Sequence, residues 1–290
     1  MKHLILIVMI LSGYITIAQG NKSYDYCYTR NKTIYVYSLA EKKEYPVPLP
    51  YSTDPSLSPD GKKVAYTAYD AKGERTVMTI DLNTKRKTLL NTGIKNCYGP
   101  VWSPDGQYIL YNAFRKANWS ICLIDKDNHA PVVLTKDAGS SLGYYSPAWT
   151  TDSKKILIQN MESIFILDLA GNRQKTYKIA DFTDANSISS SSRFLLTADE
   201  RQMVFDRSVD DAGLDEPPSA IFIHDMNTNR SARLTQKNFN CFQPVVKGNR
   251  IFFSGYKVKE KNASVYSMDL DGKNLKLEFR NTWDFSTKNQ

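Results

Sequence analysis

Short stretches in which apolar and polar residues alternate cover most of the chain. Runs such as 63–68 and 108–112 have the two-residue period of a β-strand with one buried face. Six times a strand-like run ends in the same pattern, an apolar pair, a polar residue and a hydrophilic turn, as in 79–84. One residue marks each copy: Leu39, Leu82, Lys126, Leu169, Met226 and Leu270. The steps are 43, 44, 43, 57 and 44 residues, which is typical of four-stranded propeller blades and predicts six of them.

A second pattern repeats out of phase with the first. The segments 55–61 and 100–106 read Pro-x-x-Ser-Pro-Asp-Gly, 147–153 is a weaker copy, and 187–192 and 244–249 are eroded versions. Pro presets φ and Gly accepts positive φ, so the pattern predicts a tight hairpin turn. Each blade is therefore expected to run from an inner strand through this hairpin to a second strand, a loop, a third strand and an outer strand.

The two ends of the chain complete each other. Residues 24–29 read as a second strand with no inner strand before them, whereas residues after 281 continue past the last blade. Trp283 falls at the place that Trp102 and Trp149 occupy in their blades. We expect the C-terminal residues to form the inner strand of the first blade, which leaves the ring no open edge; a frayed tail is the alternative. The fold class is thus an all-β, six-bladed propeller of four-stranded blades, closed by pairing of the C-terminal strand with the first blade.

The first residues have the features of an export signal. A charged start at Lys2 precedes an apolar run over 4–17 and small residues near Ala18, which predicts a secretory signal peptide over 1–19 and a propeller over 20–290. A retained anchor is the alternative, but it requires a longer apolar run. No later stretch is apolar enough to cross a membrane, so we expect a periplasmic or secreted protein.

Composition and charge narrow the class further. The net charge of +8 is spread along the chain rather than clustered, and 41% of residues are hydrophobic, which favours one folded domain and argues against nucleic-acid binding. We expect a monomer. Four cysteines in an exported protein leave disulfides and buried free thiols equally open; they are Cys27, Cys97, Cys122 and Cys241.

Motifs for catalysis or cofactors are weak. Residues 139–143 match Gly-x-Ser-x-Gly, but a nucleophile elbow needs a following helix, and only His129 and His224 could act as bases for Ser141 after signal removal. His224 is expected to be a packed strand residue. Residues 267–272 imitate a calcium loop without its first acidic ligand and are interpreted as a hairpin turn. We predict no catalytic residue, no metal and no cofactor.

Binding is expected at the mouth of the central channel. When the repeats are aligned, the position before the inner-strand Pro gives a set of small and polar residues at the mouth: Asp54, Gly99, Ser146, Asn186, Gln243 and Arg280. The preceding position adds three aromatic residues that could stack on a partner: Tyr98, Tyr145 and Phe242. On the same face, the long insertion at 206–218 carries the carboxylates Asp210, Asp211, Asp215 and Glu216. Long loops are often functional, although ordinary loop residues and a solvated insertion remain the alternatives.

The Ser-Pro-Asp-Gly hairpin after a Pro-x-Trp strand, as in 100–106, resembles the repeats of TolB-like periplasmic proteins. The resemblance covers nearly the whole chain after residue 19 and is clearest over 54–113. It implies a propeller that serves as a protein-binding platform in the bacterial envelope. TolB itself carries an α/β domain before its propeller, and this chain has only a few residues there, so a role in the Tol complex does not follow. Related repeats occur in peptidases and oligogalacturonate lyases. A polysaccharide-binding or polysaccharide-cleaving propeller, and a small-ligand or metal sensor at the mouth, therefore remain alternatives to a partner protein.

Overall fold

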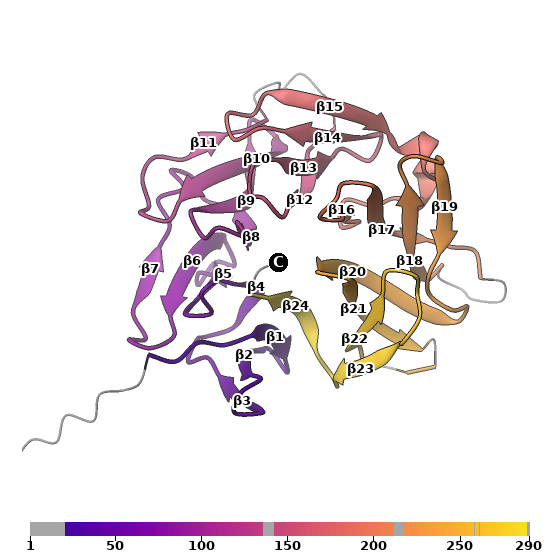
Figure 1. Cartoon of the computed structure of the whole chain (residues 1–290). Coiled ribbons are helices and arrows are strands. Elements are labelled where there is room, and N and C mark those ends of the chain that lie inside the picture. Colours follow the sequence, from indigo (N-terminus) through magenta and orange to yellow (C-terminus); the bar gives the residue numbers. More distant parts are fainter. Residues whose placement is uncertain (1–20, 136–141, 212–216, 258, 261, 289–290) are drawn as a thin grey trace, which may run out of the picture.

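In a computed structural model, six four-stranded antiparallel sheets stand around a central axis (Figure 1). The structure describes residues 21–135, 142–211, 217–257, 259–260 and 262–288. The predicted signal peptide lies outside these residues. The predicted fold class is confirmed.

The first three blades take their strands in sequence order, except that the inner strand of blade one comes from the end of the chain. Blade one consists of β24 (Trp283–Thr287), β1 (Tyr26–Arg30), β2 (Thr33–Ser38) and β3 (Lys43–Pro46). Blade two consists of β4 (Ser52–Leu57), β5 (Lys63–Tyr69), β6 (Arg75–Asp81) and β7 (Lys87–Leu89). Blade three consists of β8 (Cys97–Trp102), β9 (Tyr108–Arg115), β10 (Asn118–Asp125) and β11 (Val132–Val133).

The remaining blades repeat this order. Blade four consists of β12 (Tyr145–Trp149), β13 (Ile156–Gln159), β14 (Ser163–Leu167) and β15 (Arg173–Lys178). Blade five consists of β16 (Phe194–Leu196), β17 (Gln202–Ser208), β18 (Ser219–Asp225) and β19 (Arg230–Arg233). Blade six consists of β20 (Phe239–Lys247), β21 (Arg250–Lys257), β22 (Ser264–Asp269) and β23 (Lys276–Phe279). Two short 3₁₀ helices precede blade five, η1 (Ile179–Asp181) and η2 (Ala185–Ser187).

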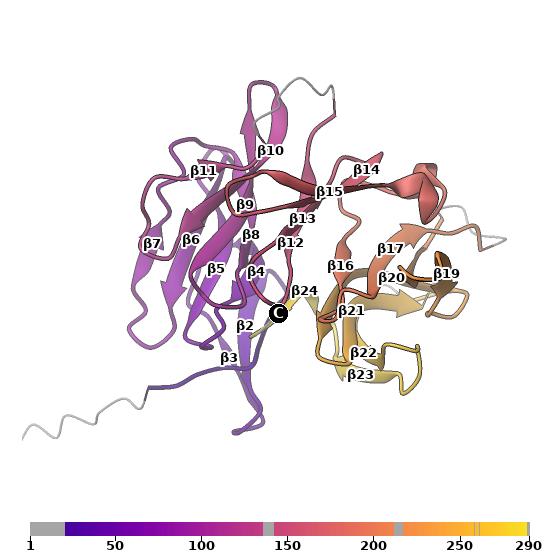
Figure 2. The same cartoon turned by 45° about the horizontal axis from the view of Figure 1, so that its top comes forward.

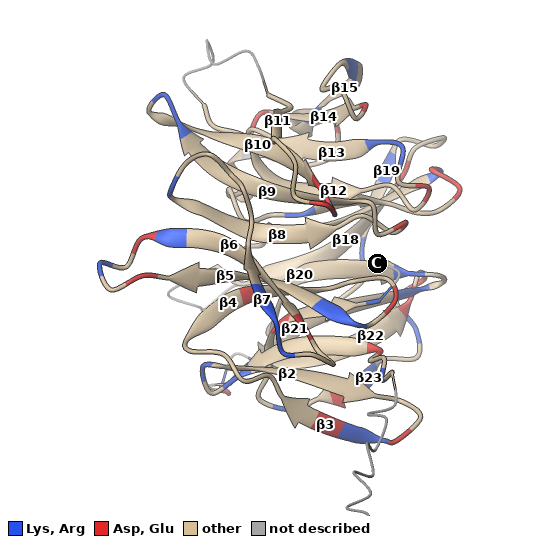
Figure 3. Ribbon diagram, turned by 90° about the vertical axis from the view of Figure 1, so that its left-hand side faces the viewer, with Lys and Arg blue, Asp and Glu red and all other residues tan. Residues whose placement is uncertain are grey.

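The inner strands lie nearest the axis and the outer strands lie at the periphery of the ring (Figures 1 and 2). Each inner strand starts at one end of the channel, which we call the mouth, and runs to the opposite end. The mouth face also carries the loops between second and third strands, and the hairpin face carries the Pro-Asp-Gly turns. Charged side chains lie mainly in the turns and outermost strands, as β3 and β7 show (Figure 3).

Aromatic and aliphatic side chains of the second strands fill the space between blades. Tyr66, Tyr111 and Phe253 stand at matching positions of β5, β9 and β21, and each is at most 1% exposed. Each such ring removes about 150–250 Å² from water. The four cysteines are free and buried in this core, where burial raises the pKa of Cys122 to about 11. Within the described part of the chain, no helix is long and apolar enough to span a membrane.

The predicted closure is confirmed, but the prediction for Trp283 is wrong. β24 pairs antiparallel with β1, with Cys27 opposite Ser286 and Thr29 opposite Trp283. Trp283 is 42% exposed, whereas Trp102 is 6% exposed. The reason is register: counted along the inner strand, Thr287 matches Trp102, and Phe285, which is 6% exposed, anchors the closing strand.

The predicted hairpin of blade five is also misplaced. The turn lies at 197–200. It is recognised by the Thr197 hydroxyl, which donates to the Asp199 carboxylate at 2.7 Å just as the Ser103 hydroxyl donates to Asp105 at 2.6 Å in the hairpin of blade three. Ser187 instead ends η2, and residues 188–192 belong to the connection that follows it. The long repeat step therefore comes partly from this connection and partly from the loop between β17 and β18.

Candidate binding face and channel mouth

Five of the six inner strands carry a β-bulge at the same place. In blade three, Tyr98 pairs with Asn112 and Val101 with Leu110, so Gly99 and Pro100 together face one residue of β9. Equivalent register shifts occur in blades one, two, four and six. Bulges bend a strand and redirect a side chain. The repeated bulge therefore sets the shape of the channel mouth.

The first bulged residue takes the left-handed conformation in all five blades. The φ angles lie between 49° and 64° at the five positions Asp54, Gly99, Ser146, Gln243 and Asp284. Only glycine adopts this region without cost, and for other residues left-handed backbone is strained and concentrates at functional sites. Four non-glycine residues in this conformation therefore stand around one opening.

Blade five departs from this pattern. β16 pairs without a shift, Phe194 with Phe205, and Arg193 takes the corresponding place at the mouth. The Arg193 backbone N–H donates to the Asp206 carboxylate at 2.8 Å. The sequence assignment of Asn186 and Arg280 to the mouth is wrong: both are exposed, in η2 and between β23 and β24, and neither lines the mouth cavity. Arg193 and Asp284 stand there instead.

Aromatic side chains form a rim around the opening. Tyr98, Tyr145 and Phe242 stand one residue before the bulge, and Trp283 holds the same position in blade one. The rings of Phe242 and Trp283 lie 5.7 Å apart. We call Tyr98, Tyr145, Phe242 and Trp283 the aromatic rim.

The rim extends outward over blades two and three. Tyr98 packs edge-on against Trp119 at 4.9 Å, and the Arg75 guanidinium lies 4.3 Å from the centre of the Tyr98 ring. Tyr51 and Phe114 are 53% and 43% exposed. Exposed aromatic and cationic side chains together are the composition of protein-binding surfaces.

A second ring, missed at the level of sequence, lies behind the aromatic rim. The second strand of every blade carries one buried polar residue opposite the rim position: Thr29, Thr67, Asn112, Gln159, Asp206 and Ser254. The signal was present in the sequence, because each of these residues follows three apolar or aromatic ones, as in 109–112 and 203–206. We call this set the polar ring.

Members of the polar ring differ in how they are paired. The Thr67 hydroxyl donates to Asp54 at 2.7 Å and accepts the Gly99 N–H at 3.0 Å. Gln159 donates to the Ser189 carbonyl at 2.9 Å. In contrast, the Asn112 Oδ1 and Ser254 Oγ atoms are buried without a partner, as is Gln243 Oε1 at the mouth.

A cavity of about 170 Å³ opens at the mouth. Residues from every blade line it, including Asp54, Asn112, Arg193, Gln243 and Asp284, together with Pro55, Pro100 and Pro147. Burial and the neighbouring charge of Asp54 raise the pKa of Asp284 to about 6, against the opposing effect of Arg193. Burial likewise raises the pKa of Asp206 to about 6. The mouth is therefore polar and predominantly acidic.

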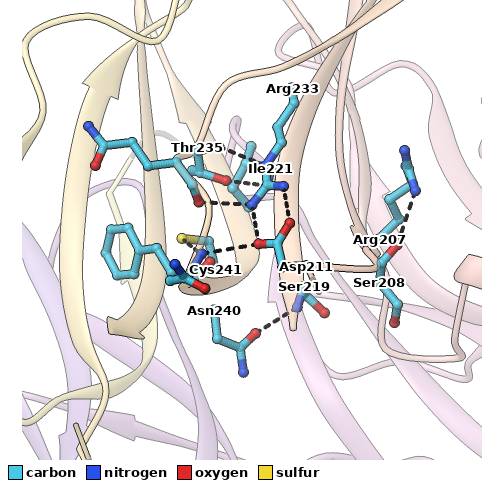
Figure 4. A network of polar contacts seen from close by, with 12 residues as sticks. Arg207, Ser208, Asp211, Ser219, Ile221, Arg233, Thr235, Asn240 and Cys241 are labelled. Atoms are coloured by element: carbon cyan, nitrogen blue, oxygen red, sulfur yellow. Dashed lines mark hydrogen bonds and ion pairs between the residues drawn. The ribbon is translucent and has the colours of Figure 1, made fainter. Parts of the chain in front are cut away.

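The described start of the acidic insertion is held by an ion pair at Asp211. Asp210 is exposed, but Asp211 is 5% exposed. Its carboxylate accepts two hydrogen bonds from the Arg233 guanidinium at 2.7 and 2.9 Å and one from the Asn238 N–H at 3.1 Å (Figure 4). The interpretation of Asp211 as part of an exposed acidic patch is wrong. Asp215 lies outside the described residues.

The two histidines considered as catalytic bases lie on different blades. Ser141 lies outside the described residues. His129 is exposed and bonds Asp125 at 2.7 Å on blade three. His224 is 2% exposed on β18, beside Ser231 and the Phe182 ring, which confirms it as a packed strand residue. Among the described residues, no three His, Cys, Asp or Glu side chains form a group that could hold a metal.

No family model and no curated protein matches this chain. Solved structures do. The structure of putative TolB from Agrobacterium tumefaciens is 17% identical, with a TM-score of 0.66 over 92% of this chain and 94% of that one. The chain shares the propeller fold of that protein.

Two further structures support the same fold. TolB from Acinetobacter baumannii is 20% identical, with a TM-score of 0.64 over 92% of this chain and 67% of its own. A chain of the Nidogen/Laminin complex is 12% identical, with a TM-score of 0.63 over 91% of this chain and 98% of its own. The likeness shows a TolB-like, six-bladed propeller.

Proposed function

We propose that this protein is a non-enzymatic, exported propeller that binds a partner protein of the cell envelope through its mouth face. The main observation behind this proposal is the β-bulge that five blades share. It holds strained residues around an opening that is surrounded by Tyr98, Tyr145, Phe242 and Trp283. The resemblance of the repeats to those of TolB-like proteins implies a protein-binding platform, and one similar chain was solved in the Nidogen/Laminin complex.

The proposed binding surface consists of the aromatic rim, the left-handed residues Asp54 and Gln243, and the exposed Asp210. Aromatic side chains provide large contact area with little loss of conformational entropy, and the surrounding charges steer encounter. The signal peptide predicted from the sequence of residues 1–19 supports export to the periplasm or beyond, and the protein is expected to act as a monomer.

Site-specific photo-crosslinking tests this proposal. A photoreactive phenylalanine derivative is placed at Trp283 on the mouth face, or at Leu39 on the hairpin face, which is 50% exposed and so a matched control. Cells carrying each variant are irradiated, and crosslinked proteins are identified by mass spectrometry. We expect a discrete envelope-protein adduct at position 283 and none at 39. An adduct at 39 alone, or no adduct at 283, contradicts the proposal.

A further inference from the structure

Oxygen atoms that lack hydrogen-bond donors gather at the channel mouth. Asn112 is 4% exposed, and its Oδ1 atom has no partner. Its amide orientation is fixed, because Nδ2 donates to the Tyr98 carbonyl at 3.4 Å. Gln243 Oε1, in the same cavity, is also buried and unpartnered. Buried polar atoms are nearly always paired, so such atoms call for a ligand or water.

Two carboxylates from neighbouring blades add negative charge to the same cavity. Asp54 of blade two and Asp284 of blade one both line it. They lie close enough that the charge of Asp54 affects the ionisation of Asp284. Two like charges in a half-buried site disfavour the empty state, and a bound cation would relieve their repulsion.

One part of the cavity lining is apolar, although serine hydroxyls from several blades also line the cavity. Pro55, Pro100 and Pro147, with Val101 and Phe285, line the cavity of about 170 Å³. Cavities of about 150 Å³ hold a molecule the size of benzene. The space therefore suits a short alkyl chain that ends in a small polar head.

The direction of the acceptors distinguishes between cations. Asp54, Asn112, Gln243 and Asp284 approach from blades two, three, six and one, so they surround the cavity instead of forming a planar fork. An ammonium group is a compact charge with three donors, whereas a guanidinium requires planar, paired acceptors. The Arg193 cation on the remaining side limits the site to a single positive charge.

We infer that the channel mouth binds an alkylammonium group, carried by a lysine side chain or a free amino terminus of the partner. Asn112 Oδ1 and Gln243 Oε1 accept its hydrogen bonds, and Asp54 and Asp284 provide the opposing charge. This inference deepens the proposed function and rests on it for the source of the ammonium group.

Short peptides test the site on the purified protein without the partner. Affinities are measured by isothermal titration for four amidated peptides: acetyl-Ala-Lys-Ala, acetyl-Ala-norleucine-Ala, acetyl-Ala-Arg-Ala, and Ala-Ala-Ala with a free amino terminus. We expect the lysine peptide or the free-terminus peptide to bind at least tenfold more tightly than the norleucine peptide. Which of the two is tighter identifies the source. Equal binding of the norleucine peptide, or tighter binding of the arginine peptide, overturns the inference.

Variants locate the binding within the mouth. Asp54→Asn and Asp284→Asn keep a side chain that tolerates left-handed backbone. Each should weaken the binding of whichever ammonium peptide binds more tightly by at least tenfold. Asn112→Leu should weaken its binding similarly. Because this variant also loses the hydrogen bond from Nδ2 to the Tyr98 carbonyl, its melting temperature is measured to confirm that it is folded. Asp127→Asn, at an exposed turn of the hairpin face, is the matched control and should change nothing. Unchanged affinity in the mouth variants, or equal loss in the control, contradicts the assignment.

The two proposals fail in different ways. Crosslinking at position 283 without any preference for ammonium peptides leaves a protein-binding face and rejects the ammonium site. Ammonium binding that depends on Asp54 and Asp284, without a crosslink at 283, supports the site but rejects the protein partner as its source.

Discussion

Blades three and five share one architecture and differ at the mouth. β8 of blade three is bulged, with Gly99 in the left-handed region, whereas β16 of blade five pairs regularly and Arg193 lies outside that region. Both blades nevertheless form a hairpin held by a hydroxyl–carboxylate hydrogen bond and bury an aromatic residue on the second strand. A blade therefore folds without the bulge. The bulges in the other five blades are better explained by the shape of the mouth than by the needs of the fold.

Blade five differs also in how its mouth-face loop is fixed. The loop between β5 and β6 in blade two is a tight turn in which the Asp70 side chain accepts backbone N–H groups of Lys72 and Glu74. In blade five the longer loop is anchored by the Asp211–Arg233 pair. The five bulged blades thus place left-handed residues around the opening, and blade five contributes Arg193 and a loop that is anchored at Asp211.

Removal of the closing strand should have the largest effect. Ending the chain after Asn281 deletes Phe285 and the Ser286 hydroxyl, which accepts the Leu57 N–H at 3.2 Å, and it exposes the backbone edge of β1. Loss of a buried Phe alone costs about 3–5 kcal/mol, a large part of a typical stability of about 5–15 kcal/mol. Thermal unfolding should show a strongly lowered or uncooperative transition.

The control for this truncation is Trp283→Ala. Because Trp283 is 42% exposed, the single change should lower stability far less than the deletion. A melting curve for the truncated chain that matches the full chain would show that β24 does not close the ring.

Breaking the Asp211–Arg233 ion pair of blade five should have the second-largest effect on stability. Arg233→Met leaves a nearly buried carboxylate without its cation, and the loss should be about 2–3 kcal/mol in urea unfolding at pH 7, less than for a fully buried pair because Arg233 is partly exposed. Arg233 lowers the pKa of Asp211. This contribution is therefore present above the unfolded pKa of about 3.9 and is lost as pH falls through the folded value. Equal loss from Arg230→Met, an exposed residue of the same strand, would contradict this account.

The mouth carboxylates should give the opposite pH dependence. The pKa of Asp284 is raised to about 6, above the value of about 3.9 in unfolded chains. The folded state then binds more protons between these values, so this term lowers stability as pH rises from about 4 to 6. The groups facing Asp284 are Asp54 from β4, Arg193 before β16, and the Thr29 hydroxyl and Cys27 thiol of β1.

Urea unfolding at several pH values isolates this term. Relative to Asp284→Asn, the unmodified protein should lose about 1 kcal/mol between pH 4 and 7, allowing for the partial exposure of the carboxyl. A difference between the two proteins that stays constant over this range would refute the assignment.

Substitution by glycine at the mouth should have opposite effects on stability in a bulged blade and in blade five, which has no bulge. Gln243→Gly removes a strained residue with a φ of 54° and should stabilise the protein by about 0.5–1 kcal/mol. Arg193→Gly, at the corresponding place in blade five, relieves no such strain and should destabilise it by about 0.5–1 kcal/mol. Chemical denaturation measures both. Destabilisation by both substitutions would mean that the bulge is not strained.

The sequence predicted the repeat better than the mouth. The period of the polar turn pattern and the Pro-Asp-Gly hairpins placed the six blades and the closure. Assignments at single positions failed where a local feature changed the number of residues between equivalent positions of two blades. In blade one, alignment on Trp283 overlooked that a tryptophan can occupy the rim position before the bulge. In blade five, the missing Pro and the added 3₁₀ turns hid Arg193. The exposure of Asp211 could not be read from charge, because its partner Arg233 lies 22 residues away.

The most direct test of the mouth face is the affinity of the crosslinked partner for two sets of variants. Isothermal titration compares Tyr98→Ala, Phe242→Ala and Asp210→Asn with Asp60→Asn and Asp105→Asn, which lie on the hairpin face. Aromatic anchors of interfaces contribute about 2 kcal/mol or more each, so the aromatic changes should weaken binding at least tenfold. Asp210→Asn should mainly reduce the salt-sensitive association rate, and the hairpin-face changes should have little effect. Binding that survives the first set and fails with the second would place the partner on the opposite face and contradict the account.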